Sequence, residues 1–316
     1  MGKTIIQRLL YFLLTLLLVS LFLFSVFYFL KGDSSSVILG EEISEEAKDN
    51  YIGSMKIKKG FLSGYLSSMR RLFTLDWGNT LSGESIRNVV ASSFPVSLSL
   101  SVWSFILSFP LSLFLSIRAV RREGFSALFL ALLSALLLLF PSFLSSVILI
   151  LVFSSTLNIF PVAGYISLCE GLWAHLRSII LPSLALSLLN MSFMLRIFRE
   201  TLDANMRKPF VNYARAKGVR EKSLVVREAL KPSLPVIIST TAQSVVSFFA
   251  SSTVVETVFA LPGMGRALVR SAQSRDYSLS FVLVMVDVTV ICLVLSVSKI
   301  LISCIDRRGE RENGKA

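Results

Sequence analysis

The sequence predicts an all-α integral membrane protein with six transmembrane helices. Of its 316 residues, 53% are hydrophobic and 24 are Phe, and the mean hydropathy is +0.71. Six apolar runs are each close to the roughly 20 residues that a helix needs to cross a bilayer. Clusters of Lys and Arg follow several of these runs. A water-soluble domain of this length does not have such a composition.

The charge and the rarer residue types exclude other classes of protein. The formal net charge is +12, but the basic residues are scattered between apolar runs, which leaves no compact surface for nucleic acid. Their placement fits orientation in a bilayer instead. The single histidine, His175, is predicted in an exposed loop, which argues against a metal or catalytic site built on imidazole. The cysteines lack metal-ligand spacing and are predicted to be small packing residues: Cys169, Cys292 and Cys304.

The first predicted span is residues 9–30, and Lys3 and Arg8 precede it. This run is longer than the apolar region of a signal peptide and lacks a clear cleavage site, so we interpret it as a membrane helix with a cytoplasmic N-terminus.

Residues 31–93 carry eight acidic and eight basic residues. Without an excess of positive charge, this segment is predicted to be extracytoplasmic, with an amphipathic surface helix over residues 84–90.

Serine residues recur along the second predicted span, residues 94–117. Their spacings of three and four place them on one face of a helix: Ser97, Ser101, Ser104, Ser108, Ser112 and Ser116. Small polar residues in this pattern usually let membrane helices pack closely, and packing is the favoured interpretation. The alternative is a hydrated solute path, with Ser101, Ser104 and Ser108 as candidate lining residues.

The third and fourth predicted spans flank an outer loop. Residues 125–153 form the third span, which is long enough to tilt or to be broken near Pro141, and residues 154–178 form the loop. The fourth span, residues 179–197, ends at Arg196 and Arg199. Because basic residues are enriched in cytoplasmic loops, residues 199–235 are predicted to lie in the cytoplasm.

A short helix is predicted within this basic loop. Pro209 stands at a first helical position and Gly218 where a helix would stop. A helix of about two turns is not stable by itself in water, so we expect it to be docked against the rest of the chain. Pro232 ends a second helical pattern, whose apolar face is formed by Val225, Val226, Ala229 and Leu230. The pair would form an elbow that fits another protein; alternatively, it is a basic interfacial loop that only follows membrane topology.

The fifth predicted span, residues 236–255, repeats the polar stripe. Its candidates for a solute path are Ser244, Ser247 and Ser251, with Thr240 on the same face and Gln243 beside it. The same stripe would also suit an interface with a second subunit.

A turn follows this span, indicated by Pro262, Gly263 and Gly265. Glu256 lies at the membrane boundary, where a carboxylate is costly unless it is paired or hydrated. We expect Glu256 to be a hydrogen-bonded anchor of the turn rather than a solute contact, with Arg266 as a candidate partner.

The sixth predicted span, residues 280–303, contains Asp287. An acidic residue within a membrane helix is a functional candidate, or else a hydrogen-bonded residue that faces the bundle or another subunit. The basic tail, residues 306–316, is predicted to be cytoplasmic, so six spans leave both termini on the same side.

Several strings resemble the membrane subunits of binding-protein-dependent ABC importers, in the dipeptide, oligopeptide and nickel branch. The densest resemblance, residues 209–277, includes ARAKG and ETVFALPGMGRALV, and DWGNTLSGESI and NIFPVAGY add to it. Ala214 takes the place of the second alanine of the family's coupling motif, and Gly218 that of its glycine. Asn212 and Tyr213 stand where that motif has Glu and Ala, so the family's glutamate contact is not carried over.

The resemblance implies a permease that imports peptides or a similar small solute. It divides the chain into an N-terminal helix (1–30), an extracytoplasmic loop (31–93), a permease core (94–305) with a coupling loop (199–235), and a tail (306–316). Contacts to the ATPase would come from Phe210, Tyr213, Ala214, Lys217 and Gly218.

The implied partners are a second permease subunit, ATPase subunits, an extracytoplasmic solute-binding protein and the lipid bilayer of the bacterial inner membrane. The sequence contains no G-x-x-x-x-G-K-[ST] phosphate loop. We therefore expect no cofactor on this chain and ATP-Mg on the partner ATPases. Three alternatives stay open: nickel or another small solute as cargo, a gradient-driven transporter or channel, and a structural membrane protein.

Overall fold

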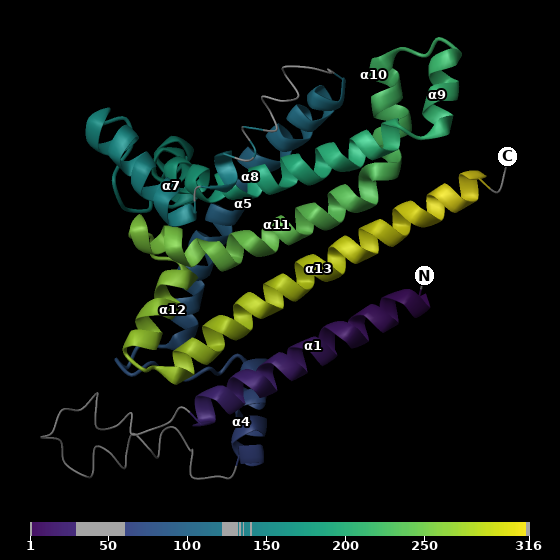
Figure 1. The fold of residues 1–316 in the computed structure, drawn as a ribbon. Helices are drawn as coiled ribbons and strands as arrows, with labels where there is room; N and C mark the ends of the chain where they lie inside the picture. The colour runs from purple at the N-terminus through teal and green to yellow at the C-terminus, as the bar shows by residue number, and fades with distance from the viewer. Residues whose placement is uncertain are drawn as a thin grey trace, which may run out of the picture. The chain divides into compact units, whose positions relative to one another are not determined.

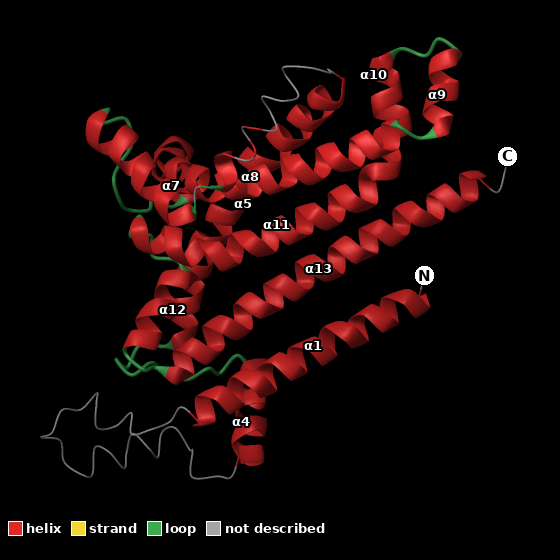
Figure 2. Cartoon of the chain, in the orientation of Figure 1, coloured by secondary structure: helices red, strands yellow, loops and turns green. Residues whose placement is uncertain are grey.

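The computed structural model describes residues 2–29, 61–121, 132, 134, 136–139 and 141–313. Its regular elements are helices joined by loops (Figure 1, Figure 2). Five helices of this part of the chain are long and apolar enough to cross a membrane: α1 (Gly2–Phe29), α5 (Ile86–Arg121), α8 (Leu172–Met206), α11 (Lys231–Val258, continuous with Val225–Leu230) and α13 (Tyr277–Asn313). These five correspond to five of the six predicted spans.

The remaining predicted span, residues 125–153, begins outside the described residues. Its second part consists of α7 (Ser142–Leu149) and a π-helical turn, η1 (Ile150–Thr156). Pro141 precedes α7 with φ −57° and ψ 152°, which is not a helical conformation. Of the two predicted outcomes, a tilt or a break near Pro141, the structure shows the break: Pro141 is the non-helical residue at which α7 begins.

The chain divides into two compact units. The first contains residues 1–94 and 266–292, and the second contains residues 95–265 and 293–316. In the first unit, the ring of Phe24 in α1 meets Phe61 and Tyr65 of α4 (Phe61–Thr74) and Phe281 of α13 edge to face. In the second unit, α5, α7, α8 and α11 bury a common core that includes Leu100, Leu149, Ile179, Leu186 and Phe248. Apolar packing between helices thus organises each unit.

α4 is absent from the prediction, which has residues 31–93 as one polar extracytoplasmic segment. Apolar residues recur within α4 at helical spacing: Phe61, Leu62, Tyr65, Leu66, Met69, Leu72 and Phe73. This period predicts an amphipathic helix. Counting charge over the whole segment concealed the pattern.

Several helices extend beyond the predicted apolar runs. α5 begins at Ile86, so the predicted surface helix over 84–90 is wrong: residues 86–90 are the first turns of α5. α8 begins at Leu172, so residues 172–178 are helical rather than part of the predicted outer loop. An apolar run reports only the part of a helix that must avoid water, whereas the backbone can stay helical beyond it.

Pro232 does not end a helix, contrary to the prediction. The chain passes from α10 (Glu221–Leu224) through a π-helical turn, η3 (Val225–Leu230), directly into α11, with Pro232 in its first turn. A proline inside a continuous helix removes one backbone hydrogen bond, and the π turn directly before Pro232 is where the register of these hydrogen bonds changes.

Candidate functional site

The predicted elbow is present as two short helices beyond the ends of α8 and α11 (Figure 1). α9 (Pro209–Ala216) begins at the predicted proline, and Gly218 has φ +81° in the turn after it. Only glycine adopts this left-handed conformation without a steric cost. α10 and η3 return the chain to α11. The helix and both of its predicted boundaries are confirmed.

The base of α9 is anchored in a small core. Val211 is fully buried against Leu202 and Met206 of α8 and against Leu224 and Val225 of the returning segment. Ala214, a predicted contact for the ATPase, is partly buried on this core. A two-turn helix gains its stability from such packing rather than from its own hydrogen bonds, as expected.

One residue of the second predicted face lies elsewhere. Val225 and Ala229 are buried and Leu230 is packed against the same core, but Val226 is 54% exposed. The predicted four-residue apolar face is therefore wrong at Val226. A π turn advances fewer degrees per residue than an α-helix, so side chains that would share a face in an α-helix diverge.

The outer side of α9 presents aromatic and basic side chains. Phe210 is 44% exposed and Tyr213 is 64% exposed. The ammonium group of Lys217 lies 4.5 Å from the centre of the Tyr213 ring. Arg215 Nε donates to Glu221 Oε1 at 2.6 Å and so links α9 to α10. Because both side chains are about half exposed, this ion pair contributes little stability.

The serine stripe of α5 is an interhelical contact. All six of its serines are buried. The hydroxyl groups of Ser104, Ser112 and Ser116 donate to backbone carbonyl oxygens of α8, at Ser183 (3.2 Å), Met191 (3.1 Å) and Leu195 (3.1 Å) respectively. This is the close helix packing that small polar residues permit, so the favoured interpretation of the stripe is confirmed for these three.

The candidate path residues differ in exposure. Ser101 and Ser244 are buried, and neither hydroxyl has a hydrogen-bond partner within the described ranges. Ser247 and Ser251 of α11 are partly exposed, and Asp287 of α13 is partly buried and has an interaction partner. Their role along a solute path stays a prediction.

Glu256 anchors the turn after α11, as predicted. Its carboxylate is fully buried and accepts a hydrogen bond from Ser97 Oγ at 2.7 Å. The same Ser97 oxygen accepts from the backbone N–H of Met264 at 2.8 Å. Ser97 thus connects α5, the end of α11 and the start of α12 (Met264–Gln273). Arg266 as an ion-pair partner of Glu256 stays a prediction.

The backbone of this turn depends on close approach to α11. The N–H of Leu261 donates to the carbonyl of Glu256 at 2.8 Å, and Ala260 has φ +54°, which together form a Schellman motif at the end of α11. A Cβ atom at Gly263 would lie 2.3 Å from Glu256 Cδ, and one at Gly265 would lie 2.4 Å from Thr253 Oγ1. Both glycines are needed because any side chain would collide.

His175 is not exposed in a loop as predicted; it is fully buried in the first turn of α8. Its Nδ1 lies 2.7 Å from the carbonyl oxygen of Ile166, and its Nε2 lies 3.0 Å from Ser99 Oγ and 3.1 Å from Trp103 Nε1. A carbonyl oxygen only accepts and an indole N–H only donates, so Nδ1 carries the proton and Nε2 accepts. His175 therefore joins α5, α8 and the loop before α8.

The sequence does not predict this cluster, because its members are far apart in the chain. Tyr165 also belongs to it: its ring stands edge-on to that of His175 at 5.5 Å, and burial raises the pKa of its hydroxyl, an effect that a hydrogen bond with Ser99 opposes. Cys169 is exposed in the same loop, so its prediction as a packing residue is wrong.

Replacing His175 with Phe is expected to lower the thermal unfolding midpoint by several degrees. Phe leaves the buried hydroxyl of Ser99, the partly buried indole N–H of Trp103 and the carbonyl of Ile166 without this partner, at a cost of about 1–3 kcal/mol. The midpoint can be measured in detergent, with Trp173→Phe as the control because Trp173 is 80% exposed in the same turn of α8. Equal midpoints for wild type and His175→Phe would show that the cluster does not stabilise the fold.

Comparison with known proteins identifies the family. The model of the binding-protein-dependent transport system inner membrane component matches residues 108–310, which include the elbow and the Glu256 turn. A protein of Brucella suis biovar 1 (strain 1330), described as a peptide transport system permease, is 27% identical over 278 residues, covering 87% of this chain and 88% of its own length. The oligopeptide transport system permease protein OppB of Escherichia coli (strain K12) is 29% identical over 260 residues, covering 80% and 82%.

The matched residues make up more than half of the chain, and they coincide with the region of densest motif resemblance. The elbow, the polar helix contacts and the long apolar helices are thus features of a transport subunit. The chain belongs to the family of binding-protein-dependent transport system inner membrane components, the non-catalytic permease subunits of ABC importers.

Proposed function

We propose that the chain is one of two membrane subunits of an ATP-driven importer of peptides. The observation that carries this proposal is the elbow: α9 is fixed at its base by Val211 while Phe210 and Tyr213 project outward. A rigid short helix with exposed aromatic side chains is suited to fit a groove on another protein. The resemblance to ABC importers makes that protein the ATPase subunit.

The elbow would act as a lever. Closure of the ATPase dimer around ATP would push α9, and because Val211 is packed against α8 and the start of α11, the push would reach both long helices. The helices would then rock between inward-open and outward-open states. Val211 of α9 shares its buried core with Leu224 and Val225 of the returning segment, so the elbow would move as one body.

This function requires six spans and cytoplasmic termini. Basic residues precede the first span, surround the elbow and form the tail, which the positive-inside rule places in the cytoplasm. With the elbow inside and the loop before α8 outside, this scheme needs the third predicted span, residues 125–153, to cross the membrane as well. The domains are then the N-terminal helix (1–30), the extracytoplasmic loop (31–93), the core (94–305) with its coupling loop (199–235), and the tail (306–316).

The partners follow from the same scheme. They are a second, homologous permease subunit, ATPase subunits that bind ATP-Mg, and an extracytoplasmic binding protein that delivers the solute. Peptides are the proposed cargo because both relatives are described as peptide or oligopeptide permeases. Within the described residues no three His, Cys, Asp or Glu side chains are grouped to hold a metal ion, so nothing in this part of the chain favours nickel over peptides.

Site-specific cross-linking in the assembled complex tests the elbow. A cysteine at Tyr213 is expected to cross-link to the ATPase subunit, whereas a cysteine at Leu168 is not, because Leu168 lies in the loop proposed to be extracytoplasmic and is equally accessible in this chain at 51% exposed. Both variants need a background in which Cys169, Cys292 and Cys304 are replaced. A cross-link from Leu168 and none from Tyr213 would reject the proposed orientation.

Reconstituted uptake tests the transport function. Proteoliposomes that contain both permeases and the ATPases, supplied with binding protein and ATP, are expected to accumulate labelled peptide. Omitting ATP should abolish accumulation, and an imposed ion gradient should not replace ATP. Uptake that needs only the gradient would instead support a gradient-driven transporter.

A further inference from the structure

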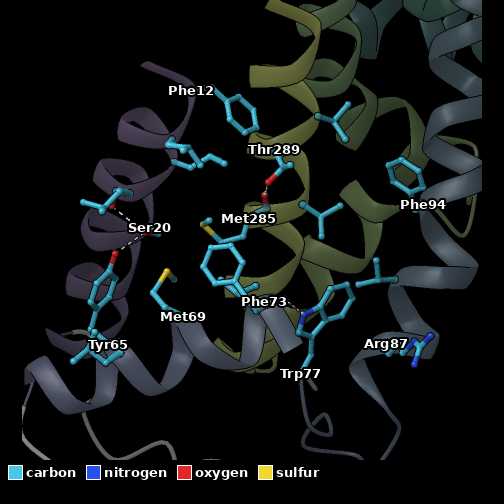
Figure 3. Close-up of a pocket in the computed structure, with 18 of the residues that line it drawn as sticks. Phe12, Ser20, Tyr65, Met69, Phe73, Trp77, Arg87, Phe94, Met285 and Thr289 are labelled. Carbon is cyan, nitrogen blue, oxygen red and sulfur yellow. Dashed lines mark hydrogen bonds between the residues drawn. The ribbon is translucent and has the colours of Figure 1, made fainter. Parts of the chain in front are cut away.

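The first compact unit contains a large apolar cavity, which Figure 3 shows in close-up. Its volume is about 880 Å³, within the range of cavities that hold whole small-molecule ligands, about 300–1,000 Å³. The walls come from α1, α4, the first turns of α5 and the middle of α13. Representative lining residues are Phe12, Met69, Phe94 and Met285. These side chains offer hydrocarbon contact over most of the cavity.

The polar groups of the lining are nearly all satisfied within the unit. Ser20 Oγ and Tyr65 Oη are hydrogen-bonded to each other at 2.9 Å. Trp77 Nε1 donates to the carbonyl of Leu72 at 3.3 Å, and Thr289 Oγ1 donates to the carbonyl of Met285 at 2.7 Å. A solute that needs several hydrogen bonds would find few groups available, so the cavity favours an apolar occupant.

Arg87 is the exception. It is the charged residue of the lining and is exposed, and the described part of the chain gives it neither an ion pair nor a hydrogen bond. Figure 3 places it beside Trp77 at one end of the cavity, with Phe12 and Phe94 towards the other. A guanidinium group binds phosphate through paired N–H donors, and Trp prefers the level of the lipid headgroups. The cavity therefore has a polar, cationic end and an apolar body.

We propose that this cavity binds an acyl chain of one anionic phospholipid, with the phosphate group on Arg87. Such a lipid matches the cavity in polarity and in charge. Its acyl chain would fill the apolar body of the cavity, and its one phosphodiester group would meet the guanidinium group of Arg87. A lipid at this position would fill the space between α1 and the other helices of the unit, which otherwise lose packing contacts across the cavity. The competing occupant is a protein segment from a partner subunit. Such a segment would need to place an acidic group beside Arg87.

Quenching of Trp77 fluorescence by brominated lipid tests the site. The whole importer is reconstituted in phosphatidylcholine nanodiscs with increasing amounts of phosphatidylglycerol that carries bromine on its acyl chains. Subtracting the fluorescence of a Trp77→Phe complex separates the emission of Trp77 from that of Trp103 and Trp173. Quenching is expected to saturate at low phosphatidylglycerol content, whereas brominated phosphatidylcholine should quench only in proportion to its content.

Two variants and one control variant, compared with the wild type, locate the site. Arg87→Gln should shift half-maximal quenching to about tenfold higher phosphatidylglycerol content, because a charge-assisted contact of this kind contributes at least a factor of ten in affinity. Ala91→Phe fills the cavity and should remove the saturable component, whereas Leu98→Phe, on the same helix but outside the lining, should keep it. Melting curves of the four complexes confirm that each is folded.

Two results would overturn the proposal. Proportional quenching by phosphatidylglycerol in the wild type would mean that Trp77 meets only bulk lipid. No quenching by any brominated lipid, together with cross-linking of a cysteine at Ala91 to another subunit, would mean that a protein segment fills the cavity.

Discussion

Replacing both Phe210 and Tyr213 with Ala is expected to reduce ATP-driven uptake at least about tenfold without loss of the subunit from the membrane. The two side chains are three residues apart, so they lie on neighbouring positions of one side of α9. Both are exposed in this chain. Large aromatic side chains dominate the binding energy of protein interfaces, and losing 1.4 kcal/mol of docking energy lowers the affinity tenfold.

The measurement is peptide uptake and ATP hydrolysis by the same proteoliposomes. We expect stimulation of the ATPase by the loaded binding protein to fall together with uptake, because the elbow would no longer transmit movement in either direction. Val226→Ala is the matched control, since Val226 is also exposed but lies on η3 rather than α9. Uptake by the double variant equal to that of the control would exclude these side chains from coupling.

A single methyl group at Gly263 is expected to destabilise the turn after α11 by more than any exposed substitution. The Cβ atom of Gly263→Ala would lie 2.3 Å from Glu256 Cδ, far inside contact distance, and the carboxylate is held by Ser97. Forcing extra volume into a packed site typically costs about 1–3 kcal/mol. We expect a lower unfolding midpoint and less assembled complex, measured in detergent extracts.

A double-mutant cycle identifies the cause. In a Glu256→Ser background the carboxylate is absent, so the added methyl group of Gly263→Ala should cost much less than in the wild type. Pro262→Ala is the control, because Pro262 is exposed in the same turn. If Gly263→Ala costs the same in both backgrounds, the collision with Glu256 is not the reason for the glycine.

The elbow could be predicted from the sequence because its signals are local. Pro209 favours a first helical turn through its own fixed φ, and Gly218 ends the helix through its own freedom at positive φ. The face of the serine stripe is equally local, since helical spacing places residues three and four apart on one side. In both cases the signal lies in the residue types and spacing of a short stretch of chain, so the element can be predicted without the tertiary structure.

The error at Val226 shows where local patterns fail. The prediction assumed an α-helical period, whereas residues 225–230 form the π turn η3, in which Val225 and Ala229 are buried and Val226 is exposed. α4 was missed for the opposite reason: its local pattern was present, but a charge balance summed over residues 31–93 hid it.

The sequence by itself determined the membrane class, the approximate spans, the break at Pro141 and the ends of α9, because each follows from hydrophobicity or from the backbone of one residue type. Only the tertiary structure decided which polar side chains meet. It paired Glu256 with Ser97 and His175 with Ser99, Trp103 and Ile166, across separations that no local period reaches. It also closed the cavity beside Arg87, since a cavity exists only once distant helices pack imperfectly around a shared space.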